Sequence, residues 1–417
     1  MLSTHPDQLD TLVTVLNLIR SGGGRTRPEL ARQSGLGRAV ISQRLVQLVD
    51  WGLVESADLA PSTGGRAPRE LRFRADTGKL LVADVGATSL RVGLTDLAAH
   101  PHAEHEETWD VAKGPEETLS RVEELFAPLL EMPETRATAL WGIGVGLPGP
   151  VEFATGRPIS PPIMPGWDRY PVRQRLSAKY GVPVWVDNDV NLMALGELHA
   201  GVASGESDVV YIKIGTGIGA GLISGGRLHR GAQGCAGDIG HIAVADEPAV
   251  VCRCGNVGCL ETIAGGAALA REGLTAALEG RSHYLSNLLS KGRSIEAMDV
   301  AAAAQSGDIA SVEMLANTGR HVGETLATLV NFFNPSLVVV GGGVASAGDA
   351  LLATIREGVY RRSLPLATRD LRIVRSSLSG QEGVIGGAFM VLEELFDRQY
   401  LGSWIASGSP IDLQQVS

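Results

Sequence analysis

One histidine and three cysteines fall within a short stretch of this chain of 417 residues. His241 precedes the run Cys252-Arg-Cys254-Gly-Asn-Val-Gly-Cys259, in which glycines lie between the second and third thiols. Zinc in a structural site takes four nitrogen or sulfur ligands in a tetrahedron. Glycine lets the backbone turn tightly enough to direct three sulfurs to one point. The sequence therefore predicts a closed Zn²⁺ site of His241, Cys252, Cys254 and Cys259, which braces the fold and does no chemistry.

A disulfide among the three clustered cysteines is the alternative to zinc. We expect zinc, because residues 1–10 are polar and show no secretory signal, and cytosolic thiols stay reduced. No apolar run is as long as a membrane span. We therefore expect a soluble cytoplasmic protein without a membrane partner. Cys235, the fourth cysteine, lies among small residues and is expected to be buried and inert.

The charges are unevenly distributed along the chain. Residues 1–78 hold ten arginines, no lysine and eight acidic residues, whereas the remainder holds 26 basic and 38 acidic residues. An arginine-bearing N-terminal segment on an acidic body is typical of a small nucleic-acid-binding module joined to a second function.

The N-terminal segment has the helix pattern of a DNA-binding protein. A first apolar-periodic helix ends at three glycines, and a short helix over 28–33 follows. The turn Ser34-Gly35-Leu36 then leads into a third helix over about 38–51. This order predicts a helix-turn-helix whose last helix enters the major groove and contacts base edges. The exposed face of that helix is expected to present Arg38, Ser42, Gln43 and Arg44.

Two strand-like segments, starting near residues 52 and 70, flank a loop that contains Gly64-Gly65-Arg66. The pattern predicts a hairpin wing with Arg66 at its tip, where an adjacent minor groove attracts arginine by its negative potential. The alternative is a protein–protein module with solvated arginines. We favour a winged helix-turn-helix on double-stranded DNA, because a recognition helix and a basic wing occur in the right order.

From residue 79 the chain becomes glycine-rich, and strand and helix signals alternate. Such alternation indicates layers of helices on sheets, that is, an α/β fold. The apolar runs fit buried strands. The expected strands cover 80–85, 90–96, 141–145, 184–186, 209–214 and 337–340, and the expected helices cover 116–132, 309–333 and 384–399.

Two glycine loops come directly after predicted strands. Gly86-Ala87-Thr88 and Gly215-Thr216-Gly217 can expose backbone N–H groups to phosphate oxygens, and each adds a threonine hydroxyl. Asp84 can hold Mg²⁺ through water. A third run, Gly341-Gly-Gly343, can pass beneath a flat ligand such as adenine. Ordinary turns explain many such loops, but three of them favour a phosphate or nucleotide site. Its residues are predicted to be Asp84, Gly86, Thr88, Gly215, Thr216 and Gly217.

A cluster of polar residues predicts a sugar site. Asp187-Asn188-Asp189 follows a strand, and α/β proteins bind ligands at the carboxyl ends of strands. Asp238, His241 and Glu261 flank the predicted zinc site, which would hold them rigid. Amide, imidazole and carboxylate groups supply the donors and acceptors that sugar hydroxyls need, and Asp189 is a candidate general base. Helix capping is the alternative for any single carboxylate. The predicted sugar ligands are Asn188, Asp189, Asp238, His241 and Glu261.

Taken together, these motifs resemble the ROK family of repressors, open reading frames and kinases, over essentially the whole chain. The matching segments are Asp84-Val-Gly86-Ala-Thr88, Val145-Gly-Leu-Pro148-Gly149-Pro150, Asp187-Asn188-Asp189, Gly215 to Gly231, Ala236 to His241 and Cys252 to Glu261. The resemblance implies a two-lobed, actin-like sugar-kinase fold of the RNase H-like type, with sugar and nucleotide in the cleft. Family repressors carry an N-terminal winged helix, and stand-alone kinases do not.

Two positions depart from the pattern of the family's kinases. Ala87 stands where they usually have glycine, and its methyl group can obstruct the approach of a phosphate. Asp238 stands where they usually have glutamate, so its carboxylate reaches one methylene less far into the sugar site.

The expected domains are a winged helix-turn-helix over 1–78, a first lobe over 79–195 completed by a helix over 384–400, a second lobe over 196–383, and a frayed tail over 401–417. The expected function is a sugar-responsive transcriptional regulator, a repressor, which binds operator DNA as a homodimer or homotetramer and responds to a sugar or sugar phosphate. The rival is an ATP-dependent sugar kinase that uses Mg²⁺ and ATP, with Asp189 as base. A third reading is a constitutive DNA-binding protein with a purely structural body.

Overall fold

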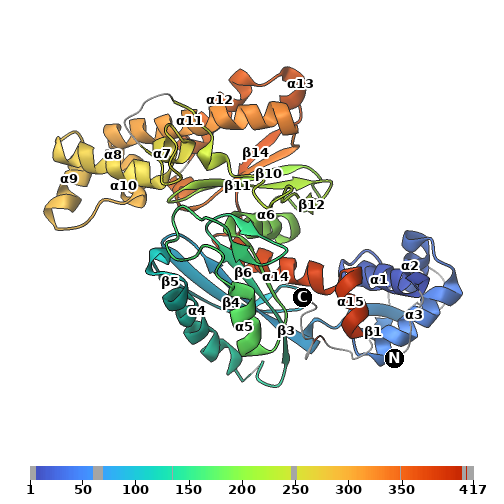
Figure 1. Ribbon diagram of the computed structural model, residues 1–417. Helices are drawn as coiled ribbons and strands as arrows, with labels where there is room; N and C mark the ends of the chain where they lie inside the picture. The colour runs from blue at the N-terminus through green and yellow to red at the C-terminus, as the bar shows by residue number, and fades with distance from the viewer. Residues whose placement is uncertain are drawn as a thin grey trace.

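The computed structural model describes residues 6–59, 69–133, 135–245, 251–347, 349–405 and 410. Three parts follow one another: an N-terminal helical module, a first α/β lobe and a second α/β lobe (Figure 1). The module lies beside the first lobe and away from the second. Among the described residues, no helix is both long and apolar enough to cross a membrane.

The N-terminal module contains three helices and a two-stranded sheet, namely α1 (Pro6–Arg20), α2 (Arg27–Ser34), α3 (Arg38–Asp50), β1 (Val54–Leu59) and β2 (Arg69–Phe73). The two strands pair antiparallel. A capping box starts α2, because the Thr26 hydroxyl accepts the Glu29 N–H and the Glu29 carboxylate accepts the Thr26 N–H. Gly35 ends α2 in the left-handed conformation at φ 69°. The hairpin loop with Arg66 lies outside the described residues.

The two lobes are built on sheets with the same strand pattern. The first sheet has the order β5-β4-β3-β6-β9 and the second the order β12-β11-β10-β13-β14. In each, the first three strands pair antiparallel and the last two join in parallel. The strands are β3 (Gly78–Val85), β4 (Ser89–Asp96), β5 (Pro101–Thr108), β6 (Ala139–Leu147), β9 (Val184–Asn188), β10 (Val209–Ile214), β11 (Ile218–Ser224), β12 (Arg227–Leu228), β13 (Leu337–Gly341) and β14 (Arg372–Arg375). A short separate hairpin joins β7 (Val151–Glu152) and β8 (Arg157–Pro158).

Each sheet has one face covered by helices of its own lobe and the other by a pair of helices that lies between the two sheets. In the first lobe its own helices are α4 (Pro115–Leu130) and α5 (Val172–Tyr180), and in the second they are α7 (Leu260–Ala264), α8 (Gly266–Leu278), α9 (His283–Ser290), α10 (Ala297–Gln305), α11 (Ile309–Phe333), α12 (Asp349–Arg362) and α13 (Pro365–Thr368). Leu81 and Ala83 of β3 share a core with α4 and α5, whereas the alternate residues Leu80 and Val82 share one with α14 (Glu382–Leu395).

A pair of helices, α6 (Asp189–Ala200) and α14 (Glu382–Leu395), lies between the two sheets (Figure 1). Glycines allow the two helices to approach closely. A Cβ atom at Gly196 would lie 2.2 Å from the Glu382 carbonyl oxygen, and one at Gly386 would lie 1.7 Å from that of Leu192. Helix α14 therefore returns to the first lobe and is fixed against α6.

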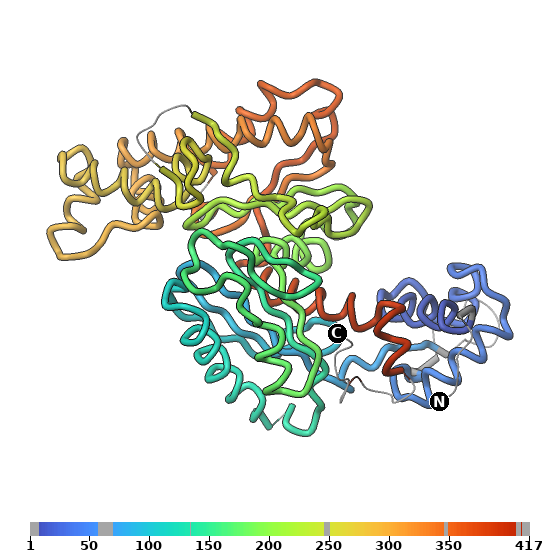
Figure 2. Tube along the Cα trace, in the orientation of Figure 1, coloured from blue at the N-terminus to red at the C-terminus, as the bar shows by residue number. Residues whose placement is uncertain are grey.

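The last helix, α15 (Arg398–Trp404), lies against α1 and connects the module to the body (Figure 2). Trp404 is 1% exposed, contacts the rings of Trp141 and Phe396 edge-on, and donates its ring N–H to the Leu395 carbonyl. Phe396 also contacts Phe73 of β2. One hydrophobic core thus runs from the module through this junction into the first lobe.

Several sequence expectations are wrong in detail. The boundary expected after residue 195 falls inside α6, and the helix expected over 384–400 is two helices, because Asp397 caps a new one. The tail does not fray from residue 402, since Trp404 and Ile405 are buried; apart from residue 410, the chain beyond 405 lies outside the described residues. Cys235 is exposed rather than buried, because its loop lines the cleft between the lobes.

Candidate ligand cleft and metal centre

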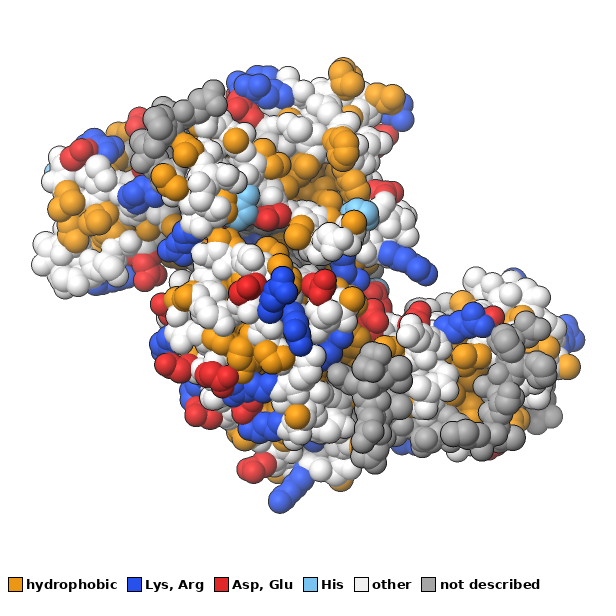
Figure 3. Space-filling view, in the orientation of Figure 1, with side chains coloured by type: hydrophobic (Ala, Val, Ile, Leu, Met, Phe, Trp, Pro, Cys, Tyr) orange, Lys and Arg blue, Asp and Glu red, His pale blue; other side chains and the backbone are white. Residues whose placement is uncertain are grey.

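A cleft of about 1040 Å³ lies between the two lobes. Histidine, acidic and basic side chains all lie on the surface where the lobes meet (Figure 3). Every residue predicted to bind sugar or phosphate lines this cleft, although they come from distant parts of the sequence: Asp84, Gly86, Thr88, Asn188, Asp189, Gly215, Thr216, Gly217, Asp238, His241 and Glu261. Their convergence follows from the fold, because the loops that carry them lie at the edges where the two sheets face each other.

The two predicted phosphate loops occupy equivalent places in the two lobes. Gly86 to Thr88 joins β3 to β4, and Gly215 to Gly217 joins β10 to β11. Across the cleft, the hydroxyl oxygens of Thr88 and Thr216 lie 3.4 Å apart. A Cβ atom at Gly217 would lie 2.5 Å from Oε2 of Glu261, so any larger residue at this position would collide with that carboxylate. The third glycine run, 341–343, lines the same cleft.

Asn188 caps helix α6, a structural role that the sequence analysis considered for the carboxylates and not for this amide. Its Oδ1 accepts the N–H groups of Val190 and Asn191 at the start of α6, and its Nδ2 donates to the Gly149 carbonyl. Asp187, beside it, accepts from Arg230 at 2.6 Å. These bonds fix the end of β9 and thereby the direction of the neighbouring Asp189 side chain.

The floor of the cleft holds charged residues that sequence reasoning missed. Lys213 Nζ, from the end of β10, donates to Asp189 Oδ2 at 2.5 Å, and Asp189 is 3% exposed. Glu382, the first residue of α14, also lines the cleft. Burial raises the pKa of Asp84 to about 7, although the nearby Lys213 opposes the rise. The sequence did not reveal the role of Lys213, because its partner Asp189 lies 24 residues away along the chain.

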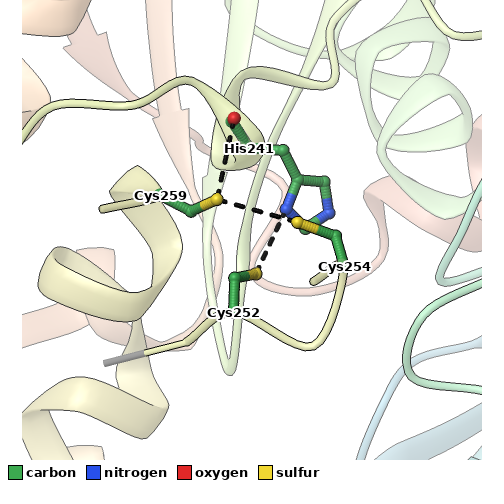
Figure 4. Close-up of side chains that lie close together, drawn as sticks. All are labelled: His241, Cys252, Cys254 and Cys259. Atoms are coloured by element: carbon green, nitrogen blue, oxygen red, sulfur yellow. Dashed lines mark hydrogen bonds between the residues drawn. The ribbon is translucent and has the colours of Figure 1, made fainter. Parts of the chain in front are cut away.

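The four predicted metal ligands converge beside the cleft, with their side chains directed toward one another (Figure 4). Their ligand atoms all lie within 4.8 Å of one another, and all three cysteines are free, which favours a metal site over the disulfide alternative. Cys254 and Cys259 have sulfurs 3.7 Å apart, and Cys252 Sγ lies 3.5 Å from His241 Nδ1. Tetrahedral zinc would place two sulfurs about 3.8 Å apart and a nitrogen about 3.6 Å from a sulfur. The spacing therefore fits a zinc ion.

His241 presents its two ring nitrogens to different surroundings. Nδ1 faces Cys252 and lies 3.9 Å from Glu261 Oε1, whereas Nε2 lies 3.8 Å from Asp238 Oδ1 at the cleft. One imidazole can thus serve a metal through Nδ1 and a cleft ligand through Nε2. Glu261 lies on α7, which begins directly after Cys259, so the cysteine loop also positions that carboxylate.

The candidate DNA surface of α3 differs from the prediction at one residue. Arg38 and Gln43 are exposed and Ser42 is half-buried. Arg44, however, is only 5% exposed, since it donates to the Thr11 hydroxyl of α1 and to the Gln47 side chain. Its placement on the exposed face was therefore wrong. Sequence reasoning also passed over three other exposed arginines around α2, which are Arg25, Arg27 and Arg32.

Comparison with known proteins gives consistent matches. The ROK family model matches residues 81–394. The DNA-binding transcriptional dual regulator NagC of Escherichia coli K12 is 30% identical over 381 residues, which is 91% of this chain and 91% of that protein. A glucokinase of Halalkalibacterium halodurans is 32% identical over 315 residues, 75% of this chain and 94% of that protein.

Among solved structures, a ROK family transcriptional regulator described as a homolog of the E. coli MLC protein superposes with a TM-score of 0.82 at 26% identity. The superposition covers 97% of this chain and 100% of the chain of that regulator. The regulator matches thus extend over more of this chain than the kinase match does. With its two matching sheets, its glycine loops facing across a cleft and a family match over most of its length, this chain belongs to the ROK family.

Proposed function

We propose that this ROK protein is a sugar-responsive transcriptional regulator that represses genes of carbohydrate metabolism. The observation that carries the proposal is the continuity of one hydrophobic core between a helical module and the body that forms the cleft. Exposed Arg38 and Gln43 on α3 supply side chains for base edges, and the arginines around α2 supply charges for phosphates. We propose that the module is a winged helix-turn-helix; the contribution of Arg66 stays a prediction.

A physical path for the response runs along α14. Its first residue, Glu382, lines the cleft, and its last turn leads into Phe396, which contacts the module. A sugar or sugar phosphate bound by Asn188, Asp189, Asp238, His241 and Glu261 changes the angle between the lobes. In a homodimer or homotetramer, this movement alters the spacing of the paired modules on the operator. A coupling of about 1–3 kcal/mol would change DNA affinity about 5- to 150-fold.

Two matched variants test this function. Duplexes that bind the full chain are first selected from a random pool, and their affinity is then measured with and without a panel of sugars and sugar phosphates. Arg38→Ala is expected to weaken DNA binding about tenfold while leaving the thermal shift by a sugar unchanged. Asp189→Asn is expected to keep DNA binding and to lose the sugar response. If no sugar changes the affinity of the unaltered chain for its selected DNA, the proposal fails.

We also propose that the His241, Cys252, Cys254 and Cys259 cluster holds a structural Zn²⁺ ion. The donor set and its spacing support zinc, and the ion would fix the loop that carries Glu261. Metal analysis of the purified protein is expected to give about one zinc per chain. Cys254→Ser should lower that content and the melting temperature, whereas Cys235→Ser, outside the cluster, should change neither.

An ATP-dependent sugar kinase is the second candidate, because glycine loops from both lobes face one cleft. Two features weigh against it. Asp189, the candidate base, is bonded to Lys213, and Ala87 brings a methyl group to the first loop. ADP release measured with the same sugar panel tests this alternative. Turnover that disappears in Asp189→Asn would favour the kinase.

A further inference from the structure

Asp84 and Lys213 occupy equivalent positions in the two lobes. Asp84 stands two residues before Gly86 at the end of β3, and Lys213 stands two residues before Gly215 at the end of β10. Side chains alternate along a strand, so both residues share a face with the residue two positions earlier, and those faces pack toward α6 and α14. The repeated sheet pattern therefore brings an acid from one lobe and a base from the other to the same layer.

Two further carboxylates enter this layer from helix starts. Asp189 is the first residue of α6 and Glu382 the first residue of α14. Glu382 is already satisfied, since Oε2 accepts the Gly380 N–H at 2.8 Å and Oε1 accepts the Tyr211 hydroxyl at 3.3 Å. Asp189 accepts a hydrogen bond from the Lys213 ammonium at Oδ2. Asp84 differs, because it is 7% exposed and its Oδ1 has no hydrogen-bond partner.

Three carboxylates thus face one ammonium. Burial alone would lower the pKa of Lys213, but the charge of Asp189, together with that of Asp84 once it has lost its proton, outweighs burial and raises it. The ammonium is therefore held in its charged form, one-fifth exposed to the cleft, between carboxylates of the first lobe. An unpaired buried carboxylate beside a cleft is the kind of group that binds a cation, and here the charge of the Lys213 ammonium already acts on it.

We propose that the Lys213 ammonium is the permanent counter-cation of the cleft and takes the place that a divalent metal ion would need between Asp84 and Asp189. The Mg²⁺ that the family's kinases imply does not fit these residues while the Lys213 ammonium is bonded to Asp189 and its charge acts on Asp84. The inference rests on the proposed function and deepens it: the cleft takes its sugar or sugar phosphate without a metal ion. Lys213 is then a positioning residue, which holds the Asp189 carboxylate toward the second lobe through its hydrogen bond to Oδ2.

The test uses Mn²⁺ alone as the probe, with the zinc-loaded full chain and the electron paramagnetic resonance signal of free Mn²⁺ as the readout. Lys213→Met removes the ammonium and keeps the length of the side chain. Lys291→Met makes the same change at an exposed lysine after α9 and serves as the matched control. Lys213→Arg keeps the charge. We expect Lys213→Met to bind one more Mn²⁺ per chain, about tenfold tighter or more than any site shared with the controls.

The additional site must disappear in the double variant Lys213→Met with Asp84→Asn, because Asp84 supplies the unpaired oxygen. The unaltered chain, Lys291→Met and Lys213→Arg should not show it. Mn²⁺ bound by the unaltered chain and lost in Asp84→Asn would overturn the proposal, even if Lys213→Met fails to fold. A folded Lys213→Met without the additional ion would overturn it as well. Neither DNA nor sugar enters the measurement, so failure of the regulator function would appear only in the DNA-binding experiment.

Discussion

The two ends of α14 lie in opposite environments. At its N-terminal end, Glu382 enters a layer of carboxylates around one ammonium, beside an open cleft. At its C-terminal end, Phe396 and Trp404 lie in a closed aromatic core that joins the module to the first lobe. Charges near a cleft respond to ligands and protons, whereas packed rings resist deformation. Helix α14 therefore connects the charged cleft, which can respond to a ligand, to the rigid aromatic junction with the module. Such a connection suits the transmission of movement from an effector to the DNA-binding module.

The largest loss of stability is expected at the aromatic junction between the module and the first lobe. Trp404→Ala should destabilise the protein by about 3–5 kcal/mol, because a large fully buried ring is replaced by a cavity. Thermal unfolding measures the loss, and DNA affinity should fall with it. Gln399→Ala on the same helix is the control, since that side chain is exposed. Equal melting temperatures for the two variants would show that the junction does not support the module.

The stability of the protein is expected to depend on pH through Asp84, in the charged layer beside the cleft. Burial raises the pKa of Asp84 to about 7, so the folded state holds its proton between pH 4 and 7, where the unfolded chain has lost it. Stability from this group is therefore present at low pH and declines as pH rises, by roughly 2 kcal/mol from pH 5 to 7. Asp84→Asn should remove that decline. The control is Asp76→Asn, at an exposed carboxylate. Parallel melting profiles for the unaltered chain and Asp84→Asn would contradict the assignment.

Arg44 extends the comparison to a buried charge that lies outside the cleft between the lobes. Its guanidinium links α3 to Thr11 of α1, so Arg44→Met should cost about 1–2 kcal/mol of stability. DNA affinity measured well below the melting temperature should change little. The exposed Arg38→Ala should behave in the opposite way, weakening DNA binding without a change in melting temperature. If Arg44→Met weakened DNA binding more than Arg38→Ala, the corrected orientation of α3 would be wrong.

The smallest loss of stability is expected at an exposed ion pair between α15 and α1, at the edge of the junction between the module and the first lobe. Arg398 of α15 lies 2.6 Å from Asp10 of α1, and both side chains are about half exposed. Solvent screens such a pair, so Asp10→Asn should change stability by less than about 1 kcal/mol, and added salt should remove the difference. A loss as large as that of Trp404→Ala would mean that charge, and not ring packing, holds the module.

Much of the fold was predictable because its buried elements carry continuous apolar patterns. The sequence predicts the strand Val209–Ile214 and the helix Ile309–Phe333 with the bounds that the structure has. It misses β5, a polar and mostly exposed edge strand that has no apolar face to reveal it. It also misses the break between α14 and α15, because an apolar period continues past the capping residue Asp397.

The sequence by itself determined which groups can bind: the histidine and thiols at metal spacing, the glycine loops after strands, and the carboxylates and amide near them. These are local signals, since each depends on a few neighbouring residues. Only the tertiary structure decided which nitrogen of His241 faces the thiols, that Arg44 points inward, and that Lys213 reaches Asp189. Each of these depends on segments that are separate in the sequence and meet only in the folded chain, and the strength of a charge follows from what surrounds it after folding.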